Sequence, residues 1–130
     1  MKYRITGVAQ SLVCIALVTG PVIAHCQDAG TAPSAQTASG KLLFEKNCVV
    51  CHKTDGSGGV QLGDVKSADL DSPGLENQYH HDSKLLERAI LDGKDEEGGD
   101  LESVMPRWRG RLTPGQVTDI IAYLKTLHTS

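Results

Sequence analysis

The feature that most constrains this 130-residue chain is the run Cys48-Val49-Val50-Cys51-His52. Residues at positions i, i+3 and i+4 of a helix lie on one face, so two thiols and an imidazole share one side of a single turn. The spacing therefore predicts a short helical turn that presents three reactive groups together.

The spacing C-x-x-C-H is the attachment signature of a c-type haem, because both sulfurs reach one porphyrin edge while the imidazole reaches iron. Other interpretations stay open. A redox dithiol is one, although such pairs sit in a βαβ context and no strand pattern is evident here. Half of a zinc site is another, with His80 and His81 as further ligands, and a chance match is the third. We expect one covalent haem c, attached through Cys48 and Cys51, with His52 as an iron ligand.

A secretory signal peptide is predicted for residues 1–24. Lys2 and Arg4 precede an apolar stretch that ends in small or apolar residues. An uncleaved membrane anchor is the alternative, since a span needs about 20 apolar residues. Cys26 adds a third option, lipidation. Residues 23–26 resemble a lipoprotein cleavage site, except that His25 stands where that pattern has a small residue. We expect a periplasmic protein, with a lipid or an uncleaved N-terminus as alternative tethers.

Residues 25–39 are rich in Ala, Ser, Thr and Gly without apolar periodicity, which predicts a flexible linker before a folded domain at 40–130. Cleavage removes two of the 13 basic residues and none of the 16 acidic ones, so the exported chain is acidic. It lacks the excess of basic residues that is typical of nucleic-acid binding. No later apolar stretch is long enough to span a membrane. A domain this short has a thin core. Two of the chain's four cysteines lie outside the domain, so a framework of disulfides cannot support it. A bound cofactor is therefore expected to supply the missing core.

Three helices are predicted in the domain. The first covers about residues 41–48, and the second covers Ser83–Asp92 with Gly93 as its C-terminal cap. The third begins at the capping box of residues 113–116 and continues with apolar residues at helical spacing. The fold class is therefore all-α, with three main helices wrapped around one covalent haem and long loops between them.

The run from Gly40 to His52, followed by Asp55-Gly56-Ser57-Gly58, resembles the opening of class I monohaem bacterial cytochromes c. The resemblance covers nearly all of residues 40–128, and C-x-x-C-H is its specific part. It implies the cytochrome c fold, in which an N-terminal helix crosses a C-terminal helix. Four residues stand where the family packs these helices together: Gly40, Phe44, Ile120 and Tyr123.

Residues 105–108 (Met-Pro-Arg-Trp) are similar to the Met-Pro-x-aromatic segment that carries the sixth iron ligand in this family. Met105 is the only methionine outside the signal peptide, and Pro106 restricts it to an extended backbone. The alternatives are a Met105 that only fills core space and ligation by His80 or His81. His/Met ligation raises the reduction potential and leaves no open site on iron, which favours electron transfer over catalysis.

The family's usual proline, whose carbonyl orients the ligand imidazole, is missing, and a carbonyl within residues 61–63 is the predicted replacement. Arg107 and Trp108 are candidate contacts for haem propionates. A docking patch that also includes Arg109 and Arg111, or a solvated face, is the alternative. Seven apolar residues are predicted to contribute to the haem pocket: Leu62, Val65, Leu70, Leu86, Ile90, Trp108 and Leu124.

The predicted function is one-electron transfer between redox partner proteins, without an enzymatic activity of the chain itself. One alternative is a haem subunit of a larger oxidoreductase complex, which has the same chemistry. The other is a peroxidase-like or gas-binding haem protein in which Met105 leaves the iron, although no distal acid–base pair is recognisable.

Overall fold

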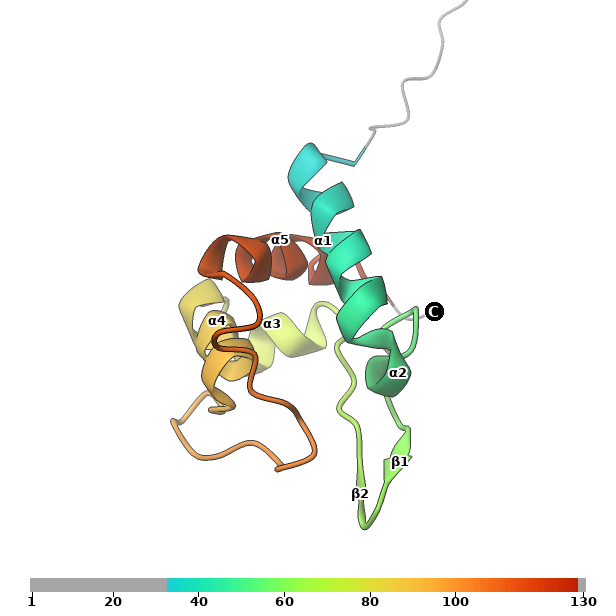
Figure 1. Ribbon diagram of the computed structural model, residues 1–130, viewed down its shortest axis with the longest axis vertical. Coiled ribbons are helices and arrows are strands. Elements are labelled where there is room, and N and C mark those ends of the chain that lie inside the picture. The colour runs from blue at the N-terminus through green and yellow to red at the C-terminus, as the bar shows by residue number, and fades with distance from the viewer. Residues whose placement is uncertain (1–32, 129–130) are drawn as a thin grey trace, which may run out of the picture. The chain divides into compact units, whose positions relative to one another are not determined.

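The computed structural model describes residues 33–128, so the predicted signal peptide, Cys26 and most of the predicted linker lie outside it. Within this range the chain forms helices and one small hairpin (Figure 1). The elements are α1 (Ala35–Asn47), α2 (Val49–His52), β1 (Gln61–Leu62), β2 (Val65–Lys66), α3 (Gly74–Gln78), α4 (Ser83–Asp92) and α5 (Pro114–Leu124). The predicted all-α class is confirmed, with the three predicted helices as its longest elements.

Helix α1 begins earlier than the sequence predicted. The Ser34 hydroxyl accepts a hydrogen bond from the Thr37 backbone N–H at 3.1 Å and caps a helix that starts at Ala35. The predicted linker end at residue 39 and the predicted helix start at residue 41 are therefore both corrected. The physical reason is tertiary, because the Ser39 hydroxyl donates to Asp119 Oδ2 of α5 at 2.8 Å and stabilises a turn that has no apolar pattern.

Helix α1 crosses α5 (Figure 1), and Gly40 lies against α5 at this crossing. A Cβ at this position would lie 1.9 Å from the Asp119 carbonyl oxygen, so the contact requires glycine. The fully buried Phe44 ring lies 5.4 Å from the Tyr123 ring at an interplanar angle of 55°, which is a favourable arrangement for an aromatic pair. Ile120 is buried in the same core cluster. The packing implied by the family resemblance is confirmed at these residues.

Helices α4 and α5 begin at the caps that the sequence predicted. The Asp82 carboxylate accepts from the Lys84 backbone N–H at 2.8 Å, and Gly93 ends α4 in the left-handed region at φ 67°. Thr113 and Gln116 form a reciprocal capping box at the start of α5, with hydrogen bonds of 3.2 and 2.9 Å. Both helices contribute buried side chains to one core.

Three short elements occupy segments that were expected to be loop. Strands β1 and β2 pair antiparallel, with Gln61 opposite Lys66 and Leu62 opposite Val65. Helix α3 has five residues and buries Leu75. Elements this short contain too few residues to show a strand or helix period in the sequence. Among residues 33–128, no helix combines the length and the apolar character that crossing a bilayer requires.

Candidate haem site

Helix α2 and its N-cap residue Cys48 place the predicted attachment residues on one turn. The backbone N–H groups of Cys51 and His52 donate to the Cys48 carbonyl at 3.2 and 2.9 Å. Both cysteines are half-buried, while His52 is 8% exposed. The two sulfurs and the imidazole therefore have the i, i+3 and i+4 placement expected from the sequence.

The His52 imidazole is held by the backbone of Ala68. His52 Nδ1–H donates to the Ala68 carbonyl oxygen at 2.9 Å. A carbonyl only accepts, so Nδ1 carries a proton, and in the neutral imidazole Nε2 is then the nitrogen whose lone pair can bind a metal. Gly58 allows the close approach of this segment, because a Cβ there would lie 2.1 Å from the same carbonyl oxygen.

The predicted position of the orienting carbonyl, within residues 61–63, is wrong. Gln61 and Leu62 pair in the hairpin, and the Gly63 carbonyl accepts from the Gln61 side-chain amide at 2.7 Å. The chain returns to His52 only after β2, at Ala68. No side-chain signal marks this residue, since any residue supplies a carbonyl.

The cysteine environment disfavours a redox dithiol. Burial, with a smaller contribution from the neighbouring Cys51 charge, raises the pKa of the Cys48 thiol to about 11, whereas a reactive dithiol needs a thiolate near neutral pH. A zinc site is not supported either. Across residues 33–128, no three His, Cys, Asp or Glu side chains gather as a metal-binding group, and His80 and His81 do not join the two cysteines in one.

Met105 lies in the loop between α4 and α5, and it is half-buried. Its backbone N–H donates to the Glu102 carbonyl at 2.9 Å. The loop is fastened to α4, because the Trp108 backbone N–H donates to the Ile90 carbonyl at 3.2 Å and the Trp108 side chain packs against the core. In the view of Figure 1 the loop lies below α5, as α2 does. Ligation of iron by Met105 stays a prediction.

Arg107 and Arg109 fasten the same loop from outside. Arg107 Nε donates to the Asp92 carbonyl at 2.9 Å, and its Nη2 donates to Asp100 Oδ1 at 3.0 Å. Arg109 donates to both carboxylate oxygens of Asp92. These hydrogen bonds hold the pKa of Asp92 below its ordinary value, and Lys94 together with Arg107 does the same for the pKa of Asp100. A propionate contact of Arg107 would compete with its bonds to Asp92 and Asp100, and it stays a prediction, as does one of Trp108.

The described residues fit a haem attached at α2. The turn offers two thiols for thioethers and an imidazole nitrogen for iron. Apolar side chains with an unburied face are available to cover a porphyrin. Of the seven predicted pocket residues, Leu86 and Leu124 are buried, and five are half-buried: Leu62, Val65, Leu70, Ile90 and Trp108. Their contact with haem stays a prediction.

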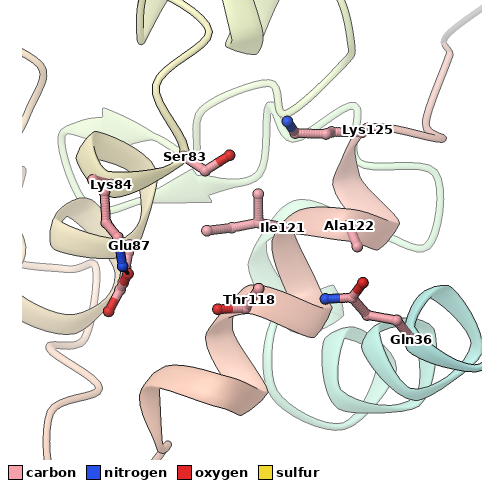
Figure 2. A pocket seen from close by; sticks show the side chains of 8 residues that line it. All are labelled: Gln36, Ser83, Lys84, Glu87, Thr118, Ile121, Ala122 and Lys125. Atoms are coloured by element: carbon pink, nitrogen blue, oxygen red, sulfur yellow. Dashed lines mark hydrogen bonds and ion pairs between the residues drawn. The ribbon is translucent and has the colours of Figure 1, made fainter. Parts of the chain in front are cut away.

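A separate shallow groove of about 230 Å³ lies between α4 and α5, beside the start of α1 (Figure 2). Ser83 and Lys84 line it from α4, and Thr118 and Ile121 line it from α5. An ion pair between Lys84 and Glu87, at 2.8 Å, stands at its α4 side. None of the predicted haem-site residues lines this groove.

Residues 37–128 match the protein family described as Cytochrome c, so the chain belongs to the cytochrome c family, whose members bind haem and transfer electrons. The family resemblance is thereby confirmed.

The relatives are of two kinds. The chain is 30% identical over 97 residues to cytochrome c6 of a Nostoc species, which covers 72% of each chain. It is 29% identical over 100 residues to the cbb3-type cytochrome c oxidase subunit FixP of Bradyrhizobium diazoefficiens, and 32% identical over 100 residues to FixP of Azorhizobium caulinodans. Each FixP match covers 75% of this chain, which spans under a third of either FixP protein, 29% and 30% respectively.

Proposed function

We propose that this chain carries one electron at a time through a single haem c, attached covalently by Cys48 and Cys51 and ligated by His52 and Met105. The observation that carries this function is the α2 turn, which presents both thiols beside an imidazole whose Nδ1 proton is already held by Ala68. Membership of the cytochrome c family supports the cofactor. When bound, haem supplies an iron that changes by one electron.

His52 and Met105 would hold the iron, and each is itself held in place by the rest of the chain. The Ala68 carbonyl holds the His52 ring in one orientation and increases the basicity of Nε2. Met105, in a loop fastened to α4 through Trp108, supplies a soft thioether that raises the reduction potential. If His52 and Met105 both held the iron, no coordination position would be left for a substrate. Electron transfer through the haem edge is the chemistry that remains.

The predicted signal peptide and the relatives support a proposal for where the chain works. The predicted signal peptide at residues 1–24 supports a periplasmic location, and so does haem attachment, because c-type cytochromes are assembled outside the cytoplasm. Cys26 is a candidate site for a lipid tether. The cytochrome c6 relative, matched over 72% of its length, supports a separate small carrier that meets redox partner proteins. The FixP relatives are named as oxidase subunits and support the second candidate, a haem subunit of a larger complex.

A redox titration of the full chain from a haem-competent host tests this function. We expect one wave with one-electron slope, haem that stays with the denatured chain, and the far-red absorption band that reports an iron–thioether bond. A folded but colourless protein would overturn the haem assignment. Covalent haem without the far-red band would overturn the role of Met105 alone.

A further inference from the structure

The segment that supplies the orienting carbonyl is itself fastened to α2 by one side chain. We propose that Ser67 is a positioning residue for His52, acting through the Ala68 carbonyl that follows it in the chain. This role rests on the proposed ligation of haem iron by His52. It assigns to Ser67 a part in setting the ligand strength of the imidazole.

The Ser67 hydroxyl makes two hydrogen bonds in different directions. Its O–H donates to the Cys51 carbonyl at 2.7 Å, and its oxygen accepts from the Val60 backbone N–H at 2.9 Å. The Ser67 backbone is held as well, because its N–H donates to the Val60 carbonyl at 3.0 Å and its carbonyl accepts from Gly59 at 2.9 Å. The side chain is half-buried, which limits replacement of these bonds by water.

The Cys51 carbonyl needs such a partner. Helix α2 has only four residues and ends at Lys53 with φ 60°, so its last carbonyls lack helical N–H partners. The Ser67 hydroxyl satisfies one of them. A donor at this point therefore both completes the helix end and ties it to a distant segment of the chain.

Residues 67 and 68, which follow the hairpin, thus hold residues 51 and 52 at the end of α2. Ser67 holds the Cys51 carbonyl, and Ala68 holds the His52 ring. The four residues form a closed hydrogen-bonded loop, so a shift of residues 67 and 68 away from α2 would stretch both bonds. Removing the Ser67 hydroxyl breaks the bond to the Cys51 carbonyl, so the bond from His52 Nδ1–H to Ala68 is then the only one of the two that remains.

The strength of that bond matters for the ligand. A histidine whose Nδ1–H donates strongly is a more basic ligand, and a more basic ligand favours ferric iron, since ligation and its hydrogen bonding tune the potential. Loss of the Ser67 hydroxyl is therefore expected to raise the reduction potential. It is also expected to expose the His52 Nδ1 proton to exchange with solvent.

The test compares haem-loaded full-length Ser67→Ala, Ser67→Thr and Ser57→Ala with the parent protein. The exchange rate of the His52 Nδ1 proton, measured by NMR of the reduced protein, is expected to rise about fivefold in Ser67→Ala, as the loss of one hydrogen bond gives. The reduction potential of the Ser67→Ala variant is expected to rise as well. Ser67→Thr keeps a hydroxyl and is expected to restore both values. Ser57→Ala loses a 2.9 Å bond to Asp55 in the same region and is expected to match the parent.

Parental exchange and potential in Ser67→Ala would overturn the role of Ser67, and so would a Ser67→Thr that behaves like Ser67→Ala. An equal change in Ser57→Ala would also overturn it, because the effect would then belong to the loop in general. If Ser67→Ala does not accumulate, Ser67→Cys, with its weaker donor, is expected to give intermediate values, and parental values would refute the role. A parent protein without His52-ligated haem would instead refute the proposed function.

Discussion

Replacing Gly40 by alanine is expected to destabilise the protein by about 2 kcal/mol. The new Cβ would lie 1.9 Å from the Asp119 carbonyl oxygen and 3.0 Å from Tyr123 Cβ. Relief of the first contact requires α1 and α5 to separate by about 1 Å, which loosens a close-packed interface. Overpacking costs about 1–3 kcal/mol, and the upper value applies because the obstacle is backbone. The better helix propensity of alanine offsets roughly 1 kcal/mol of it.

Thermal unfolding of the haem-loaded protein, followed by circular dichroism, measures this effect. A loss of this size lowers the midpoint by roughly 10 °C in a domain of about 100 residues. Gly115→Ala is the matched control, since Gly115 is exposed near the start of α5 and the nearest atom to a new Cβ is Thr113 Oγ1 at 3.9 Å. That variant is expected to be neutral or slightly stabilised. A Gly40→Ala protein that unfolds at or above the parental midpoint would refute the reasoning from helix contact.

Three further predictions concern the haem and the loop before α5. Met105→Ala is expected to leave haem attached, lower the potential and admit added ligands to iron, as visible spectroscopy and redox titration would show. Replacing Cys48 and Cys51 together by alanine is expected to remove haem from the denatured chain, checked by haem staining of a denaturing gel. The hydrogen-bonded ion pair with Arg109 holds the pKa of Asp92 below its ordinary value in the folded protein. Its stabilisation is therefore present at neutral pH and lost as the pH falls below that value, which unfolding of the parent and Asp92→Asn from about pH 7 to about pH 2 would measure.

Each of these predictions has a control and an outcome that contradicts it. Val104→Ala, at an exposed neighbour of Met105, should keep the parental potential, and a parental spectrum in Met105→Ala would exclude the thioether ligand. Cys26→Ala should keep covalent haem, whereas haem on the denatured double variant would contradict attachment. A stability difference between the parent and Asp92→Asn that stays constant down to acid pH would contradict the ion-pair assignment.

Local signals account for the parts of the fold that the sequence predicted correctly. The C-x-x-C-H turn, the limits of α4 and the capping box of α5 depend on residues within about four positions of one another, and the sequence displays these directly. Gly93 marks the end of α4 because its φ of 67° lies in a region that side chains disfavour. The expected packing of Gly40 and Phe44 came from the family resemblance instead, since no local pattern contains it.

The sequence by itself determined that a helical turn presents Cys48, Cys51 and His52 together, because helix geometry is a property of neighbouring residues. Only the tertiary structure decided which carbonyl orients His52, since Ala68 contributes a backbone group common to every residue and reaches the imidazole after a hairpin. The start of α1 at Ala35 was decided in the same way, by contacts between residues about 80 positions apart such as Ser39 and Asp119. Such contacts depend on how the whole chain closes on itself, and no short window of sequence contains both partners.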